Sequence, residues 1–306
     1  MIPETGRREP GTRTAPQPWG VLGVPSSVAA HWPGIEKGPA ALRRAGLIEE
    51  LRKGAAPVHD FGDLAVAAWA SARLGGRPNN ADGVRDVLVA ARGRIADVLR
   101  TGARPFVVGG ECTLAMAMVS AFAAIGEDVG LVYVDGGQDL AIPADHPEEP
   151  ILDSMGVAHL LDLPGTDAAV AAIGPRRPLL TDSDVVFLGY SEPEEDLHHQ
   201  VGSVRIPAAE ASAEPEAAAR RALAALEHDR VVVHVDVDVL DFLEVPAADI
   251  AVYGRGLALT TLTRLLRVLL RDPRCAGALL VEYNPDHDPE GRAGRDLVQM
   301  LGDTLA

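Results

Sequence analysis

The sequence predicts an α/β fold of three layers (α/β/α), in which helices cover both faces of an eight-stranded parallel sheet. Two features of the chain support this prediction. Short apolar runs alternate with longer stretches of helical periodicity, which is the pattern of repeated β–α units. The runs are also almost continuously apolar, as strands are when both faces of a parallel sheet are buried.

The expected strands are short runs that are rich in β-branched residues and stop at Gly, Pro or Asp. Each run is too short for a helix of ordinary length, and the breakers at its end favour a strand. The runs cover residues 20–24, 57–61, 105–108, 130–134, 184–188, 203–206, 230–235 and 276–281.

The expected helices lie between these runs and repeat their apolar residues at helical spacing. The clearest example has leucines at positions 259, 262, 265, 266, 269 and 270, which form one face of a helix. Gly102, Gly126 and Pro273 follow helical stretches and are typical helix terminators. The helices are expected at residues 38–53, 81–101, 113–125, 154–161, 210–228 and 260–271.

The length of 306 residues and the absence of an interdomain linker predict one domain over residues 18–306. Residues 1–17 are rich in charge and proline and have no apolar segment. We therefore expect them to form a disordered extension and not a secretory signal.

The overall charge argues against some classes of partner, and the cysteines argue against a disulfide-stabilised fold. A net charge of −16 argues against binding to nucleic acid or to an anionic membrane surface. The chain has no apolar run of the roughly 18 to 20 residues that span a bilayer. Cys112 and Cys275 are the only cysteines and form no CxxC pair, so a disulfide framework is not expected. The cytoplasm is the expected location.

Paired aspartates follow two of the expected strands. Asp135 and Asp139 come after the fourth strand, and Asp236 and Asp238 come after the seventh. Alternation along the chain directs Asp236 and Asp238 toward the same side. Carboxylates are hard ligands for divalent ions, and parallel α/β sheets bind ligands beyond the carboxyl ends of their strands. The two pairs therefore predict two halves of one metal site.

Five segments in order resemble the arginase/agmatinase (ureohydrolase) family, over residues 19–301. Three of them match the Gly-Gly-Asp-His-Ser, Asp-x-His-x-Asp and Ser-x-Asp-x-Asp-x-x-Asp patterns of that family, and the other two match its first strand–loop–helix and its terminal Glu-x-Asn-Pro. In the order of the chain, they are GVPSSVAAHWPGIEKGPAALRRAGL (23–47), VVGGECTLA (107–115), YVDGGQDL (133–140), HVDVDVLD (234–241) and VEYNPDHDPEG (281–291).

This resemblance implies the eight-stranded parallel sheet and the hydrolysis of a guanidinium or related amidine compound. Family members use a hydroxide that bridges two manganese ions, held by four aspartates and two histidines. Here Cys112 replaces one histidine and Gly137 replaces the other. A thiolate can ligate a metal, but glycine has no side chain to do so. We therefore expect one Mn²⁺ or none, rather than two, at Cys112, Asp135, Asp139, Asp236 and Asp238.

The resemblance also implies residues that contact the substrate. Glu282 matches the glutamate that pairs with the guanidinium, and Glu194 lies with Glu192 where relatives contact the amino group. Asp153 lies near the position of the proton-transfer histidine, and His146 is a candidate replacement for that histidine. Two other interpretations stay open: an acidic surface loop for Glu192 and Glu194, and a solvated loop histidine for His146.

Three functions are compatible with these residues. The first is a hydrolase of a small guanidino, hydroxyguanidino or related amidine compound, at a reduced metal site. The second is a catalytically inactive homologue that serves as a binding, regulatory or assembly subunit. The third uses Cys112 as a nucleophile whose pKa is lowered near a helix N-terminus, although no histidine base lies beside it in the sequence. Family analogy implies a homo-oligomer, either a trimer or a hexamer.

Overall fold

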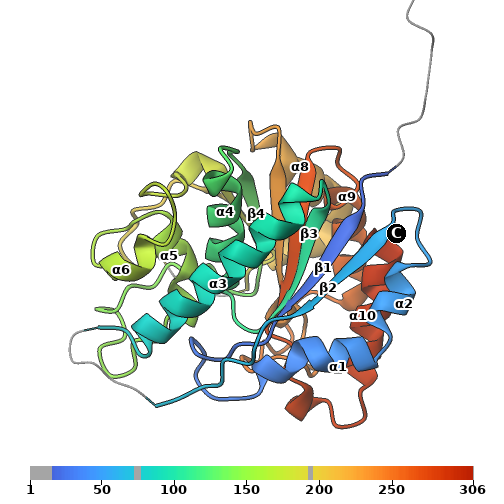
Figure 1. Ribbon diagram of the computed structural model, residues 1–306, viewed down its shortest axis with the longest axis horizontal. Coiled ribbons are helices and arrows are strands. Elements are labelled where there is room, and N and C mark those ends of the chain that lie inside the picture. The colour runs from blue at the N-terminus through green and yellow to red at the C-terminus, as the bar shows by residue number, and fades with distance from the viewer. Residues whose placement is uncertain (1–15, 72–76, 192–195, 306) are drawn as a thin grey trace, which may run out of the picture.

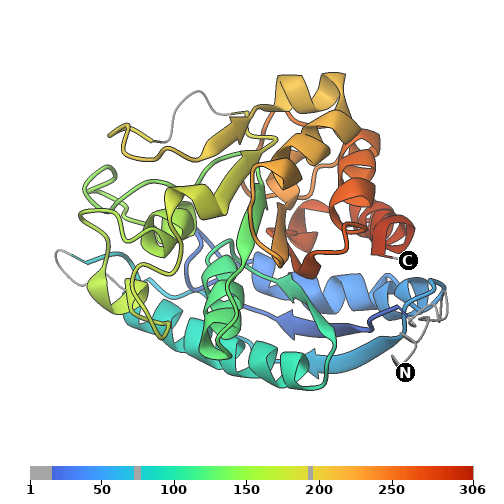
Figure 2. The same ribbon diagram turned by 90° about the horizontal axis from the view of Figure 1, so that it is seen from above.

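A parallel sheet of eight strands runs through the computed structural model (Figure 1), which describes residues 16–71, 77–191 and 196–305. The strand order is β2-β1-β3-β8-β7-β4-β5-β6, and every neighbouring pair is parallel. The edge strands β2 and β6 lie on opposite sides of the molecule (Figure 2). The strands are β1 (Trp19–Val24), β2 (Val58–Asp63), β3 (Arg104–Gly109), β4 (Gly130–Val134), β5 (Val185–Leu188), β6 (Val204–Ile206), β7 (Val231–Asp236) and β8 (Cys275–Val281).

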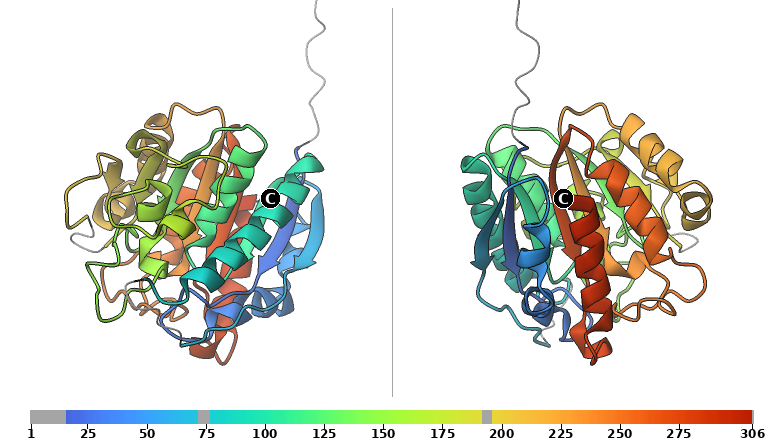
Figure 3. Two further views of the ribbon diagram at one scale, coloured as in Figure 1. Left: turned by 60° about the vertical axis from the view of Figure 1, so that its left-hand side comes forward. Right: turned by 90° about the vertical axis from the view of Figure 1, so that its right-hand side faces the viewer.

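Helices cover both faces of the sheet and bury two separate apolar clusters. One cluster joins the sheet to α1, α2, α8, α9 and α10, and the other joins it to α3, α4, α5 and α6. Figure 3 shows α3 in front of one face and α10 in front of the other. The helices are α1 (Gly38–Arg44), α2 (Leu47–Leu51), α3 (Ala81–Arg100), α4 (Leu114–Ala124), α5 (Gly156–Leu160), α6 (Ala168–Ala171), α7 (Ala208–Ala213), α8 (Pro215–Ala224), α9 (Leu259–Leu269) and α10 (Arg292–Leu305).

The three-layer α/β fold with its eight-stranded parallel sheet is confirmed, and each expected strand is present to within a residue or two. Two expected helices are interrupted. The stretch at 38–53 divides into α1 and α2 because Gly46 adopts a left-handed conformation, with a φ of 93°. The stretch at 210–228 divides into α7 and α8 at Pro215, which begins the second helix.

The C-terminal helix α10 was not among the expected helices. Its sequence contains Gly294 and Gly302, which have low helix propensity. A Cβ at Gly294 would come 2.6 Å from the Tyr283 hydroxyl, and a Cβ at Gly302 would come 2.6 Å from Glu50 Cγ. Close packing on neighbouring elements therefore explains both glycines.

The topology gathers the candidate residues at one edge of the sheet. Strands β3, β8, β7 and β4 are consecutive neighbours, so their carboxyl ends lie side by side. Cys112, Asp135 and Glu282 follow β3, β4 and β8, and Asp236 is the last residue of β7.

Two further expectations concern the ends of the chain and membranes. The extension expected at residues 1–17 falls mostly on residues 1–15, which lie outside the described part of the chain. The Gln17 side-chain amide donates a hydrogen bond to the Gly102 carbonyl. Among the described residues, no helix has the length and apolarity needed to cross a membrane.

Candidate metal centre

A cavity of about 200 Å³ opens at the carboxyl ends of β3, β4, β7 and β8. Its lining includes Cys112 and His31 and contains no lysine or arginine among the described residues. Such a cavity favours cations, because several carboxylates that share a buried site repel one another. Six carboxylate side chains line it: Asp135, Asp139, Asp153, Asp236, Asp238 and Glu282.

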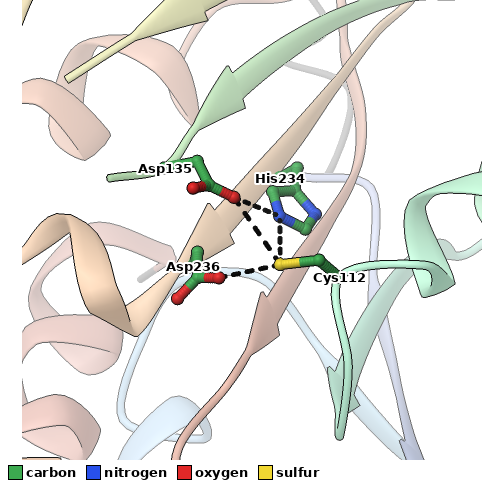
Figure 4. Close-up of side chains that lie close together, drawn as sticks. All are labelled: Cys112, Asp135, His234 and Asp236. Atoms are coloured by element: carbon green, nitrogen blue, oxygen red, sulfur yellow. Dashed lines mark hydrogen bonds and ion pairs between the residues drawn. The ribbon is translucent and has the colours of Figure 1, made fainter. Parts of the chain in front are cut away.

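Four buried side chains converge beside this cavity, and three of them line it; Figure 4 shows the four together. They are Cys112, Asp135, His234 and Asp236, and one potential ligand atom from each lies within 4.8 Å of the others. Cys112 Sγ is 3.5 Å from His234 Nε2 and 3.6 Å from Asp135 Oδ2. His234 Nε2 is 3.6 Å from Asp135 Oδ2. The Cys112 thiol donates a hydrogen bond of 2.7 Å to Asp236 Oδ2.

Backbone hydrogen bonds orient the two carboxylates. The Gly137 N–H donates to Asp135 Oδ1 at 2.6 Å, and the Asp238 N–H donates to Asp236 Oδ1 at 2.6 Å. Each carboxylate therefore uses one oxygen to hold its own loop and turns the other toward Cys112. This arrangement presents one oxygen from each strand end to a shared point.

His234 is the residue that sequence reasoning missed. It lies two positions before Asp236 on β7, so strand alternation places both side chains on one face. Tyr133 is its partner in register on β4, and the two rings stack with centroids 4.1 Å apart and planes 2° from parallel. The spacing of the two residues in the sequence was a signal that could have identified His234.

Asp139 and Asp238 lie beside the four-residue cluster but have other partners. The Tyr133 hydroxyl donates a short hydrogen bond to Asp139 Oδ2. The Gly136 N–H donates to Asp238 Oδ1 at 2.9 Å. Both carboxylates line the cavity, as their positions in the sequence predict. Of the five predicted ligands, the structure brings Cys112, Asp135 and Asp236 into the closest group.

The electrostatic environment holds Cys112 in its thiol form. Burial raises the pKa of Cys112 well above its usual range, and Asp236 and Asp135 raise it further. Burial also raises the pKa of Asp236, with additional contributions from Asp238 and Asp135. The prediction that a helix N-terminus lowers the pKa of Cys112 is therefore wrong, because burial among acids has the larger effect. A bound cation would reverse this balance.

Glu282 and Asp153 form a second group that shares Cys112. The Cys112 N–H donates to Asp153 Oδ1 at 2.9 Å and to Glu282 Oε1 at 3.1 Å. Burial raises the pKa of Asp153 to about 7, and burial and neighbouring acids, Asp153 first, raise the pKa of Glu282. Glu282 has a φ of 64°, an uncommon value outside glycine that aims its carboxyl group into the cavity. Both residues line the cavity.

Glu111, which precedes Cys112, is fully buried under this group. Its Oε1 accepts hydrogen bonds from Ser26 Oγ at 2.8 Å and from the Ala29 N–H at 3.1 Å, while its Oε2 has no partner among the described residues. Burial raises the pKa of Glu111 to about 8. The two hydrogen bonds oppose this rise in the pKa, but burial has the larger effect.

These pKa values predict that the metal-free protein loses stability as pH rises. Asp153 and Glu111 bind protons more tightly in the folded state than in the unfolded chain, where their pKa values are about 4. Between about pH 4 and 8 these two groups therefore bind more protons in the folded state, and their contribution to the free energy of unfolding falls as pH rises. We expect a fall of more than about 2 kcal/mol, since one pKa unit corresponds to roughly 1.4 kcal/mol.

Denaturant unfolding of the metal-free protein at pH 5 and pH 8 measures this effect. Glu111→Gln should flatten the dependence, because an amide replaces the neutral carboxyl group. Glu227→Gln, at an exposed position, should leave the pH dependence of the free energy of unfolding unaltered. A metal-free protein that is more stable at pH 8 would contradict the prediction.

The remaining predicted residues are distributed around the cavity. His146 is exposed on its loop and is not among the cavity-lining residues. Glu194 and Glu192 lie outside the described residues. His31 lines the cavity, and burial lowers its pKa. Gln138 is directed toward Arg205, whose Nε donates to its Oε1 at 2.8 Å.

The pair of manganese ions implied by the resemblance fits these residues only in part. At one ion position, Cys112, Asp135 and Asp236 remain, and His234 is added. At the other, residue 137 is glycine and provides no imidazole. One ion fits the residues present, and the second lacks a nitrogen ligand.

Comparison with known proteins gives the same family as the motifs. The family model described as "Arginase family" matches residues 17–305. Arginase from Staphylococcus aureus (strain MRSA252) is 26% identical over 309 residues, which cover 92% of this chain and 95% of that protein. Arginase-1 from Homo sapiens is 29% identical over 181 residues, which cover 59% of this chain and 56% of that protein.

Solved structures show the same fold. Arginase from Bacillus caldovelox aligns with a TM-score of 0.84 at 23% identity, over 95% of this chain and 98% of that one. Proclavaminate amidino hydrolase from Streptomyces clavuligerus aligns with a TM-score of 0.74 at 20% identity, over 94% of this chain and 91% of that one. Because the family model matches residues 17–305 and these structures share the fold, the chain belongs to the arginase family.

Proposed function

We propose that this protein is a hydrolase that cleaves a C–N bond of a small cationic guanidino or related amidine compound, with one divalent ion in place of two. One observation carries this proposal: the four-residue cluster and the Asp153–Glu282 pair share a single acidic cavity. The cavity thus offers neighbouring sites for a metal cation and for an organic cation. The proposal also includes assembly of the chain into a homo-oligomer. Light scattering would measure the size of that oligomer.

The residues of the chain suit the steps of such a reaction. The pKa of Glu282 is raised in the metal-free site, so a bound guanidinium or amidinium group would displace its proton, and the carboxylate would then accept charge-assisted hydrogen bonds from that group. Asp153, with a pKa of about 7, can hold a proton at neutral pH and donate it to a leaving amine. An ion bound at the cluster would act as a Lewis acid, and it would ionise a water that joins the four protein donors as a fifth ligand.

The cysteine mechanism has less support. His234 Nε2 does lie 3.5 Å from Cys112 Sγ, so a histidine is present beside the thiol after all. However, burial and several carboxylates raise the pKa of Cys112. A thiolate nucleophile is therefore unfavourable without a cation, and with one the sulfur would be a ligand.

Urea release from arginine, hydroxyarginine, agmatine and guanidinobutyrate tests the proposal, with protein loaded separately with Zn²⁺, Co²⁺ and Mn²⁺. Turnover of at least one compound that requires the ion supports a hydrolase. Binding of an ion without turnover of any compound supports the inactive homologue, which the loss of the imidazole at Gly137 favours.

Glu282→Gln is expected to lower kcat/KM about 100-fold, because a charged hydrogen-bond acceptor contributes up to about 3 kcal/mol. Metal content should be unchanged, since Glu282 lies outside the four-residue cluster. Steady-state kinetics and metal analysis measure the two effects. Glu227→Gln, which removes an exposed carboxylate before β7, is the matched control and should leave both unchanged. Equal loss of metal and of activity in Glu282→Gln would contradict this role.

A further inference from the structure

We propose that Cys112, Asp135, His234 and Asp236 form a four-coordinate site that selects a zinc-like ion over manganese. The proposal rests on the proposed function only for the presence of a single ion. In this proposal His234, on strand β7, is the nitrogen ligand of the ion. The site thereby differs from the two-manganese centre that the family resemblance implies.

Three of the separations between the donor atoms match a tetrahedral ion. Zinc lies about 2.3 Å from thiolate sulfur and about 2.0 to 2.2 Å from nitrogen and oxygen ligands. In a tetrahedron these bond lengths place sulfur about 3.5 Å from each lighter donor, and nitrogen about 3.4 Å from oxygen. The observed separations are 3.5 Å for Sγ to His234 Nε2, 3.6 Å for Sγ to Asp135 Oδ2 and 3.6 Å for Nε2 to Asp135 Oδ2.

One separation differs and has a chemical cause. Cys112 Sγ and Asp236 Oδ2 are 2.7 Å apart because the thiol donates a hydrogen bond to the carboxylate. Binding of an ion would replace this proton with a metal–sulfur bond and release the proton to solvent. The two atoms would then separate by roughly 0.8 Å to reach tetrahedral spacing.

One ring nitrogen of His234 faces the cluster. The ring is fully buried, and its Nδ1 has no hydrogen-bond partner among the described residues. Its Nε2 points at the cluster, where its polar neighbours are Cys112 Sγ and Asp135 Oδ2. Nε2 is therefore the ring nitrogen that is placed to ligate an ion.

The chemistry of the donors decides which ion fits. A sulfur ligand favours zinc and similar ions, whereas manganese prefers carboxylate, carbonyl and water oxygens. Zinc also binds a given set of donors more tightly than manganese in the usual order of stability. Asp139, which the resemblance assigns to the manganese centre, is hydrogen-bonded to Tyr133, the residue that stacks on His234. These contacts favour a compact four-donor site.

Titration of the metal-free full-length protein with Co²⁺, Zn²⁺ and Mn²⁺ tests the proposal. We expect one Co²⁺ per chain, with a thiolate-to-cobalt charge-transfer band and the intense visible bands of a tetrahedral ion. Zn²⁺ should displace Co²⁺, and its affinity should exceed that of Mn²⁺ by at least about 100-fold. A weak octahedral spectrum without the charge-transfer band, or equal affinities for Zn²⁺ and Mn²⁺, would overturn it.

Substitutions identify the donors. Cys112→Ser should remove the charge-transfer band, and Cys275→Ser, which alters the buried cysteine at the start of β8, should keep it. His234→Phe retains an aromatic ring against Tyr133 and should weaken Co²⁺ binding by more than about 100-fold, beyond the effect of losing a residue that merely supports a ligand. His31→Phe removes a histidine that lines the cavity outside the cluster and should leave binding unchanged.

Two further measurements keep the outcomes separate. Circular dichroism of the metal-free variants shows whether they fold. X-ray absorption of the wild-type zinc protein should show one sulfur and one imidazole ligand, which decides the proposal even if His234→Phe does not fold. A tetrahedral cobalt spectrum without turnover would contradict the proposed function alone, and turnover with an octahedral, sulfur-free ion would contradict the site alone.

Discussion

Asp236→Asn is expected to remove metal binding and, at the same time, to stabilise the metal-free protein. Asp236 is buried and faces Asp135, Asp238 and Cys112, so its pKa is raised in the absence of a cation. An amide relieves the burial of a carboxyl group that is ionised in the unfolded chain at neutral pH. We expect metal affinity to fall by more than about 100-fold and the metal-free protein to gain about 1 to 3 kcal/mol.

Calorimetric metal titration and denaturant unfolding at pH 8 measure these two changes. Asp241→Asn is the matched control, because Asp241 accepts a hydrogen bond from the Leu243 N–H in a turn and lies outside the cluster. It should change either quantity by less than about 0.5 kcal/mol. A metal-free Asp236→Asn protein that is less stable than wild type would show that the carboxylates do not repel one another as described.

Gly110→Ala is expected to destabilise the fold by at least about 3 kcal/mol. A Cβ at this position would stand 1.6 Å from the Ser26 carbonyl oxygen and 2.7 Å from its carbon, both of which belong to the backbone. Relief of this clash requires a backbone shift. Gly110 also donates to the Val24 carbonyl at 3.1 Å and accepts from the Glu282 N–H at 2.8 Å. The shift would therefore weaken the contacts that place Cys112 and Glu282.

Equilibrium unfolding in denaturant measures the loss, and Gly93→Ala is the control. Gly93 lies within α3, and a Cβ there would have no atom within 4 Å. Alanine in this helical position should stabilise the protein by about 0.5 to 1 kcal/mol. Similar effects of the two substitutions would contradict the close approach at Gly110.

Most of the fold could be predicted because its signals are local. Runs such as Val231–Asp236 are apolar, β-branched and bounded by breakers, so one strand can be identified without knowledge of the others. Helix α10 was missed because Gly294 and Gly302 oppose helix formation locally and are explained only by the packing of Tyr283 and Glu50 against them. Propensity is a weak guide where tertiary contacts set the residue.

The composition of the candidate site was predictable only in part. The motifs placed Asp135, Asp236 and Cys112 at neighbouring strand ends, and the structure brings these three side chains together. The motifs also predict the two positions at which family members have histidine ligands. His234 was overlooked because it occupies a different position, one that matches serine in the family pattern.

By itself, the sequence determined the parallel α/β architecture, the family and the acidic character of the site, because these depend on local patterns and on ordered motifs. Only the tertiary structure showed that the Val129–Asp139 and Arg230–Asp241 segments meet through Tyr133 and His234, in register on adjacent strands. It also showed that burial raises the pKa of Cys112 instead of lowering it. The physical reason is that donor geometry and desolvation depend on side chains from strands that are distant in the sequence and adjacent in the sheet.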